Sequence, residues 1–200
     1  MKKFTELTLK TYLDELSSDA PVPGGGSVSA YVICLAMGLT QMVGRISLKR
    51  KIKAGLSPDE EKKELERRQT IQKIIDAVEK IKKEAFQVVD LDPQIYEQVL
   101  ETKDPEKMED VLENSFRLQA DLAMLAVMAK EWNADMAGLV SGSIKNDLLV
   151  SAELLHSGFH GAHHTSMINV KYMKIQERKE RAEQALAELK ARFEKGNVHA

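Results

Sequence analysis

The sequence has little of what disulfide-bonded, β-rich or nucleic-acid-binding proteins need. Cys34 is the single cysteine, so no disulfide can form within the chain, and a reducing cytoplasm is the expected compartment. Aromatic residues make up only 5%, and only 5 prolines and 11 glycines occur, a composition that favours helix over sheet. The net charge of −2 gives no reason to expect nucleic acid as a partner.

Long hydrophobic runs are also missing. The most apolar stretch, residues 28–43, is shorter than the roughly 20 residues that a membrane span needs, and Thr40 and Gln41 lie inside it. Near the start of the chain, Glu6 and Asp14 interrupt any apolar region that could serve as a secretory signal. We therefore predict a cytoplasmic protein that does not associate with a membrane.

The chain does contain a long series of helical periodicities. Its 200 residues fit one domain, residues 1–200, with a sizeable core. No alternation typical of strands stands out, so the sequence predicts an all-α, up-and-down helical bundle with long helices. The helices are expected over residues 5–16, 27–47, 59–99, 106–131, 143–156 and 167–193, with a weaker helix or a loop over 133–142.

Two of these helices carry further expectations. The 59–99 helix has Ser57 as a plausible N-cap and Pro58 at its first position, and Pro93 should kink it without ending it, because the apolar pattern continues on both sides. The 27–47 helix is apolar nearly all round, which a bundle of this size would not cover fully. We therefore predict a homodimer with that helix in or near the interface.

A glycine-rich turn, Pro23 to Ser27 (PGGGS), opens the 27–47 helix. Exposed backbone N–H groups at a helix start can bind a carboxylate, a phosphate or a polarised carbonyl. The Gly-Lys-Ser/Thr ending of a P-loop is absent. Alternatively, the glycines allow another helix or chain to pass close by. The sequence leaves both interpretations open.

Asp92 occupies a position where the apolar stripe of the 59–99 helix calls for a hydrophobic side chain. A carboxylate turned toward an apolar interior usually has a raised pKa. Pro93 should free the carbonyl of Val89 from its helical bond and so add an acceptor nearby. Asp90 lies roughly 200° around the helix and should face solvent. The alternative to a functional Asp92 is a buried structural aspartate paired with the backbone or a basic residue.

A group of histidines follows late in the chain: His156, His160, His163 and His164. Spacings of three and four can place such side chains on one helical face, as in a metal site. No cysteine or carboxylate stands at ligand spacing within the group, and Gly158 and Gly161 are expected to break the helix. We interpret the histidines as polar or interfacial and predict no metal.

Residues 20–30 (APVPGGGSVSA) resemble the formiminotetrahydrofolate cyclodeaminase family, which includes the C-terminal domain of the bifunctional formiminotransferase-cyclodeaminase and stand-alone bacterial methenyltetrahydrofolate cyclohydrolases. Residues 89–96 look like the acidic motif of that family, an aspartate followed four residues later by an aromatic, which again selects Asp92. The resemblance covers nearly the whole chain. Further matching segments are 42–45, 146–148 and 161–169.

The resemblance implies an all-helical homodimer that converts 5-formiminotetrahydrofolate to 5,10-methenyltetrahydrofolate and ammonia, with Asp92 as the acid–base group. It implies no cofactor beyond the tetrahydrofolate substrate, which would be bound with or without a polyglutamate tail. Lys49, with the basic residues after it, would meet that tail, although the sequence favours their interpretation as solvated charge at a helix end. The full set of expected substrate-binding residues is Gly24, Gly25, Gly26, Ser27, Asp147, Asn169 and Lys49.

Two other functions remain open at this point. A methenyltetrahydrofolate cyclohydrolase in the same fold would need the same pterin pocket and one acid–base group, with water as the attacking group. A non-catalytic helical dimer that serves as an adapter would give Asp92 and the triple glycine no role.

Overall fold

The computed structural model describes residues 2–195 of the chain, and within them it is all-helical, without a strand. This confirms the predicted all-α class. The elements are a short 3-10 turn η1 (Phe4–Glu6) and the helices α1 (Leu9–Leu16), α2 (Gly25–Lys49), α3 (Pro58–Glu101), α4 (Pro105–Leu139), α5 (Lys145–Tyr172) and α6 (Gln176–Lys195).

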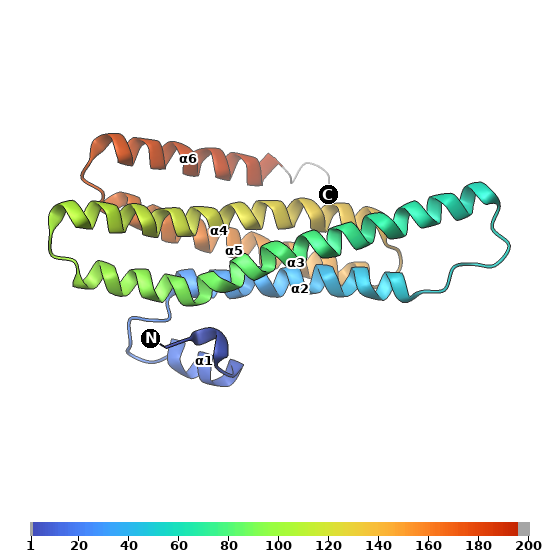
Figure 1. Ribbon diagram of the computed structural model, residues 1–200, viewed down its shortest axis with the longest axis horizontal. Helices are drawn as coiled ribbons and strands as arrows, with labels where there is room; N and C mark the ends of the chain where they lie inside the picture. The colour runs from blue at the N-terminus through green and yellow to red at the C-terminus, as the bar shows by residue number, and fades with distance from the viewer. Residues whose placement is uncertain (1, 196–200) are drawn as a thin grey trace.

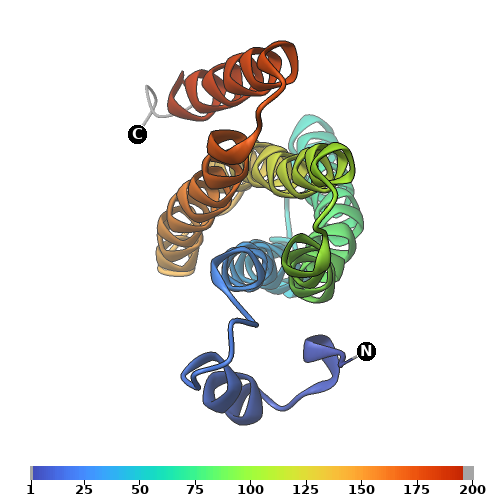
Figure 2. The same cartoon turned by 90° about the vertical axis from the view of Figure 1, so that its left-hand side faces the viewer.

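Helices α2 to α5 run up and down and form the bundle (Figure 1). Viewed from one end, α6 lies outside α4 and α5, and α1 stands apart on the opposite side (Figure 2). The apolar side chains of the four central helices form one continuous core, with Ile33 on α2, Ile71 on α3 and Leu122 on α4 among its fully buried members. A smaller second core joins α6 to α4 and α5.

By length and composition, α2 could cross a membrane, but 56% of its most apolar window is buried inside the bundle. It is the central helix of the core and packs against both α3 and α5. Burial against these helices accounts for the apolar residues on the inner face of α2.

The long third helix was predicted correctly. It begins at Pro58 after a capping box, in which the Ser57 hydroxyl accepts from the backbone N–H of Glu60 and the Glu60 carboxylate accepts from the backbone N–H of Ser57. It runs for 44 residues and continues past Pro93 to Glu101.

The expected break in α5 is absent, because this helix runs unbroken through Gly158 and Gly161. These glycines bring α5 close to α2. A Cβ at Gly158 would lie 2.5 Å from Cγ1 of Ile33, and one at Gly161 would lie 2.2 Å from Oγ of Ser29. The two glycines therefore serve a close helix crossing, and helix–helix packing overrides their low helix propensity.

The ends of the last helices also differ from the prediction. Residues 133–139, expected as a weak helix or loop, continue α4, where Met136 is fully buried. The helix expected over 167–193 is divided, because α5 ends at Tyr172 and α6 begins at Gln176. The carboxylate of the buried Glu109 accepts from backbone N–H groups in this connection, at 2.6 Å from Lys174 and 3.3 Å from Ile175. A long-range contact from α4 thus fixes the turn.

Candidate functional site

The partly buried carboxylate of Asp92 lies where α3 meets the first turn of α2 and the middle of α4. Its Oδ2 accepts a hydrogen bond of 3.0 Å from the backbone N–H of Ser27. Its Oδ1 accepts one of 2.7 Å from Nε2 of Gln119, whose side chain is fully buried. The first turn of a helix carries unpaired N–H groups and the positive end of the helix dipole. The carboxylate is therefore held by one main-chain donor and one amide donor.

A second set of hydrogen bonds fixes the turn of α3 that carries Asp92. Pro93 has no N–H, so the carbonyl of Val89 lacks its usual helical donor. Oγ of Ser27 donates to this carbonyl at 2.9 Å, which confirms the predicted extra acceptor. The hydroxyl of Tyr12 lies 3.0 Å from the same Oγ and donates to it, because the serine proton is already used.

Gly26 makes the close approach of the three helices possible. A Cβ at this residue would lie 2.1 Å from Oδ1 of Asp92 and 2.2 Å from Nε2 of Gln119. A Cβ at Gly25 would be in ordinary contact, 3.6 Å from Oγ1 of Thr165. The close-approach interpretation of the glycine-rich turn therefore holds at Gly26, while the backbone N–H of Ser27 is a donor to Asp92. That donor binds the chain's own carboxylate, so its role toward substrate stays a prediction.

The surroundings of Asp92 favour its neutral form. Burial raises the pKa of the Asp92 carboxyl above its ordinary value, against the opposing effect of hydrogen bonds from Ser27 and Gln119. Both groups that hydrogen-bond to it are uncharged. A carboxyl with a raised pKa, part-exposed at the junction of three helices, can accept a proton and return it.

Removing the Ser27 hydroxyl tests this arrangement. Ser27→Ala leaves the Val89 carbonyl buried without a donor, and we expect it to lower the free energy of unfolding by about 1–3 kcal/mol. Chemical denaturation measures the loss. Ser17→Ala, at an exposed serine that bonds only to its own turn, should change stability by less than about 0.5 kcal/mol. Equal stability of the two variants would show that the Val89 carbonyl does not depend on Ser27.

The expectation that Asp90 faces solvent is wrong. Its side chain is half-buried, and its carboxylate accepts from Thr5 twice, from the backbone N–H at 3.0 Å and from Oγ1 at 2.6 Å. The N-terminal segment does not form one helix over residues 5–16. It forms η1, which packs on α3, and then the short α1, whose one buried residue is Tyr12.

The remaining predicted residues divide between the two ends of the bundle. Asn169 lies near the end of α5 and donates to the carbonyl of Thr165, whose own side chain faces Gly25. Lys49 and Asp147 lie at the far end of α2 and the start of α5 (Figure 1). Twenty-two residues of helix, about 33 Å, separate Lys49 from Ser27. Within one chain, Lys49 and Asp147 are therefore not brought together with Asp92.

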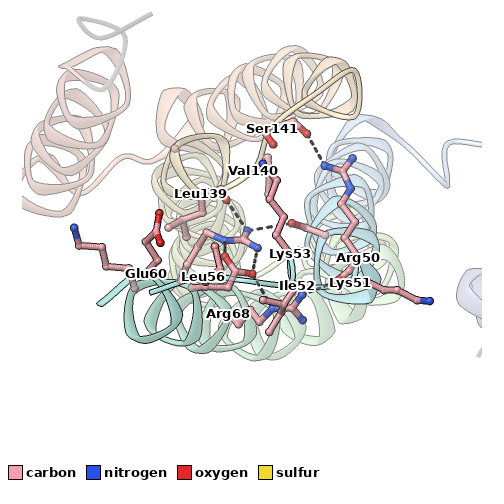
Figure 3. Close-up of a pocket in the computed structure, with 15 residues that line it drawn as sticks. Arg50, Lys51, Ile52, Lys53, Leu56, Glu60, Arg68, Leu139, Val140 and Ser141 are labelled. Atoms are coloured by element: carbon pink, nitrogen blue, oxygen red, sulfur yellow. Dashed lines mark hydrogen bonds and ion pairs between the residues drawn. The ribbon is translucent and has the colours of Figure 1, made fainter. Parts of the chain in front are cut away.

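The basic residues after Lys49 line a cavity of about 570 Å³ at that far end (Figure 3). Its arginines bind main-chain carbonyls at helix ends: Arg50 donates to Ser141 O, Arg67 to Leu139 O and Arg68 to Leu48 O, each at 2.8 Å. Positive charge at helix C-termini is stabilising. This cluster therefore ties the ends of α2 and α4 together, and the prediction that it meets a glutamate tail is not tested by this contact pattern.

The four histidines share one region of α5 beside α6. The rings of His156 and His160 lie 4.5 Å apart, and Phe159 stacks on Phe193 of α6 at 3.9 Å. Burial lowers the pKa of His160 and of His163. Over residues 2–195, no group of three or more His, Cys, Asp or Glu side chains is placed to hold a metal ion. The histidines belong to the contact between α5 and α6.

Sequence reasoning missed Gln119 and Tyr12. Gln119 interrupts the buried stripe of α4 between Phe116 and Leu122, as Asp92 interrupts that of α3. The same criterion applied to α4 would have found it. Tyr12 had no comparable signal, because the spacing of Leu9, Leu13 and Leu16 favours a different buried face, yet Leu9 and Leu13 are exposed.

The fold and this site together define an all-helical bundle with a partly buried carboxyl group at the junction of three helices. Residues 8–188 match the family model described as formiminotransferase-cyclodeaminase, and the chain belongs to this family. The resemblance seen in the sequence is therefore confirmed.

Two individual proteins illustrate the relationship. The chain is 25% identical over 175 residues to the formimidoyltransferase-cyclodeaminase of Sus scrofa, a match that covers 82% of the chain and 30% of that relative. The chain thus spans about a third of the length of this curated relative. The crystal structure of formiminotetrahydrofolate cyclodeaminase from Thermotoga maritima superposes with a TM-score of 0.85 at 21% identity, over 97% of this chain and 93% of that one. This likeness shows a shared fold.

Proposed function

We propose that the protein is a formiminotetrahydrofolate cyclodeaminase, which converts 5-formiminotetrahydrofolate to 5,10-methenyltetrahydrofolate and ammonia. The observation that carries the proposal is Asp92, a carboxyl of raised pKa held by the first turn of α2 and by Gln119. Membership of the formiminotransferase-cyclodeaminase family supports it. No cofactor beyond the folate is proposed, because the reaction needs only proton transfer.

The reaction requires the transfer of one proton from N10 to the nitrogen that leaves. N10 of the folate attacks the carbon of the formimino group, whose imino nitrogen is protonated, so an N10–C bond forms and a tetrahedral centre results. The carboxylate of Asp92 takes the proton from N10 and returns it to the amino nitrogen of that centre. The C–N bond to this nitrogen then breaks, and ammonia leaves the methenyl cation behind. General acid–base help of this kind contributes about 10²–10⁴-fold to the rate.

Substrate contacts are proposed for the groups around Asp92. The turn Gly24–Ser27 presents the N-terminal N–H groups of α2, which suit pterin or glutamate oxygens. Asn169 is proposed to contact the pterin from α5. A contribution of Lys49 or Asp147 to the same folate would have to come from a second copy of the chain, since both lie at the other end of their own bundle.

Parallel assays with two folates test the proposed reaction. With 5-formiminotetrahydrofolate, we expect the methenyl absorbance to rise and ammonia to appear in equal amounts. With 5,10-methenyltetrahydrofolate, we expect no loss of absorbance above the buffer rate. Loss of the methenyl signal in the second assay would instead identify a cyclohydrolase. No turnover of either folate would favour a non-catalytic adapter.

We further propose that the protein forms a homodimer through the outer face of α2. This face exposes apolar side chains along the helix: Leu35 is 58% exposed, Met42 37% and Ile46 41%. On the neighbouring α1, Leu9 and Leu13 are also exposed. Several large apolar side chains exposed along one helix are typical of a protein–protein interface. A second copy supplies a matching apolar face, since a two-fold interface pairs the same patch on both subunits.

Charge placed on this face should separate the subunits. We expect the wild type to have the mass of a dimer in light scattering at micromolar concentration. The double variant Leu35→Glu, Met42→Glu should have the mass of a folded monomer, because buried unpaired charges are costly. Leu65→Glu, at an exposed leucine on α3, should stay dimeric. A monomeric wild type would contradict the proposal.

A further inference from the structure

The side chain of Gln119 is fully buried and forms a hydrogen bond through only one of its two polar atoms. Its Nε2 donates to Oδ1 of Asp92 at 2.7 Å. Its Oε1 is the one buried side-chain nitrogen or oxygen atom in residues 2–195 without a hydrogen-bond partner. Buried polar atoms in native proteins are nearly always paired, so such an atom calls for an explanation.

Gln41, the other glutamine in the core, shows what a fixed amide looks like. Its Nε2 donates to the carbonyl of Ile75 at 3.1 Å and to Glu79 at 2.8 Å, while its Oε1 accepts from Nζ of Lys82 at 2.6 Å. Every partner specifies one orientation of the amide. Gln119 has one partner only, the carboxyl of Asp92, and nothing else around it selects between nitrogen and oxygen.

The partner of Gln119 is a group that can either accept or donate. An aspartate carboxylate only accepts, whereas the protonated acid has one O–H donor. An amide matches both states, because a turn of about 180° exchanges its N–H and its oxygen. A fixed donor such as the backbone N–H of Ser27 favours the carboxylate alone.

Among residues 2–195, neither hydrogen-bond partner of the Asp92 carboxylate is a charged group that would compete with this exchange. The groups that face it from α2 and α4, Ser27 and Gln119, do not titrate. From α1, Tyr12 responds to the Asp92 charge, but the pKa of its hydroxyl is raised, mainly by burial, so it stays neutral. The state of Asp92 is therefore the variable that selects the orientation of the Gln119 amide.

We propose that Gln119 is a positioning residue that binds Asp92 in both of its protonation states, by donating to the carboxylate and by accepting from the acid after the amide turns. This inference rests on the proposed function, in which Asp92 takes a proton from N10 and gives it to the leaving nitrogen. Between the two transfers, the O–H of the acid is held by Oε1 of Gln119. The carboxyl thus keeps its place in both steps.

Two variants test the role of Gln119 in turnover. Gln119→Met keeps the length of the side chain and removes both amide atoms. We expect kcat to fall by about 10- to 100-fold, with KM within about twofold. The acid limb of kcat should be half-maximal within about half a pH unit of the wild-type value. This is because the variant loses a hydrogen-bond partner of both the carboxylate and the protonated acid of Asp92. Gln119→Glu should move this limb upward, because two adjacent carboxyls share one proton.

The alternatives give different results. If Gln119 is only a fixed donor, Gln119→Met will raise the half-maximal pH by about one unit or more and leave the plateau kcat unchanged. If it only fills space, neither kcat nor the limb will change. Either result would overturn the proposal.

The side-chain amide of Gln119 can also be followed without substrate, so that this test survives a failure of the proposed reaction. In nitrogen-15 spectra, its signals are assigned by their absence from Gln119→Met. We expect them to shift with the protonation of Asp92 over the pH range in which the protein stays folded, and not to shift in Asp92→Asn.

Gln41 is the internal control. Hydrogen bonds from Lys82 and Gln41 hold the pKa of Glu79 at about 2, so the Gln41 amide should stay unchanged over the same range. If the Gln119 signals do not move while Asp92 titrates, the proposed turn of the amide is wrong. This result holds whatever the folate assays show.

Discussion

Gly26→Ala should produce a folded protein that has lost nearly all turnover. The new methyl group would occupy the space of two atoms that bind each other, Oδ1 of Asp92 and Nε2 of Gln119, which lie 2.1 and 2.2 Å from its position. Both side chains have to move, and overpacking of this kind typically costs about 1–3 kcal/mol. The displaced carboxyl can no longer meet the substrate. We therefore expect kcat to fall by about 10²–10⁴-fold, the whole acid–base contribution.

Gly25→Ala is the matched control one residue earlier. Its new Cβ would be 3.6 Å from Oγ1 of Thr165, an ordinary contact, and alanine is a better helix former than glycine. We expect equal or slightly higher thermal stability and nearly unchanged turnover. Equal activity of the two variants would mean that the position of Asp92 relative to α2 does not control the reaction.

Asp92→Asn should lower kcat by about 10²–10⁴-fold, because it removes the titratable group while keeping nearly the same shape. Folate affinity should change much less, since the amide still forms hydrogen bonds. Direct binding and single-turnover assays separate the two effects. Glu97→Gln, at an exposed residue further along the same helix, should be nearly silent. Full activity of Asp92→Asn would show that Asp92 is not the acid–base group.

The stability of Asp92→Asn should not fall with its activity. The folded-state pKa of Asp92 is raised by burial, so its contribution to stability is fully present below the unfolded pKa and is lost as pH rises through the folded pKa. At neutral pH, Asp92→Asn should therefore unfold at the same or a higher temperature than the wild type. This advantage should disappear at acidic pH, where the native carboxyl is also neutral.

Asp90→Asn is a poor control for these experiments. Asp90 binds Thr5 through both carboxylate oxygens, so the variant should loosen η1 from α3. Its effect would mix stability with chemistry, which the exposed Glu97 avoids.

Much of the fold follows from local sequence rules. The capping box at Ser57 and the unbroken apolar period identified α3, and Asp92 stood out because it interrupts that period. The missing N–H of Pro93 predicted a carbonyl at Val89 without its helical donor, and the Oγ of Ser27 donates a hydrogen bond to it. These features depend on neighbours within a few residues along the chain, which a sequence shows directly.

Contacts between distant segments could not be predicted in the same way. Gly158 and Gly161 have low helix propensity, and only the presence of α2 at close range explains why α5 continues through them. Asp90 was expected in water because a helical wheel contains no information about η1. The partner of Asp92 on α4, Gln119, is 27 residues away along the chain.

The topology of the bundle alone separates Lys49 and Asp147 from Asp92 within one chain. In an up-and-down bundle, the start of one helix lies beside the end of the next. The start of α2, the late part of α3 and the end of α5 therefore share one end of the bundle, which contains Ser27, Asp92 and Asn169. Lys49 and Asp147 necessarily lie at the other end.

The pH dependence of kcat, measured with 5-formiminotetrahydrofolate for the wild type and Asp92→Asn, tests the role of Asp92 most directly. For the wild type, we expect activity to rise with pH along an acid limb whose midpoint lies above the ordinary pKa of an aspartate, because the carboxylate must first accept a proton. In Asp92→Asn, the residual activity should lack this limb. A limb that persists at the same pH in the variant would show that another group carries the proton.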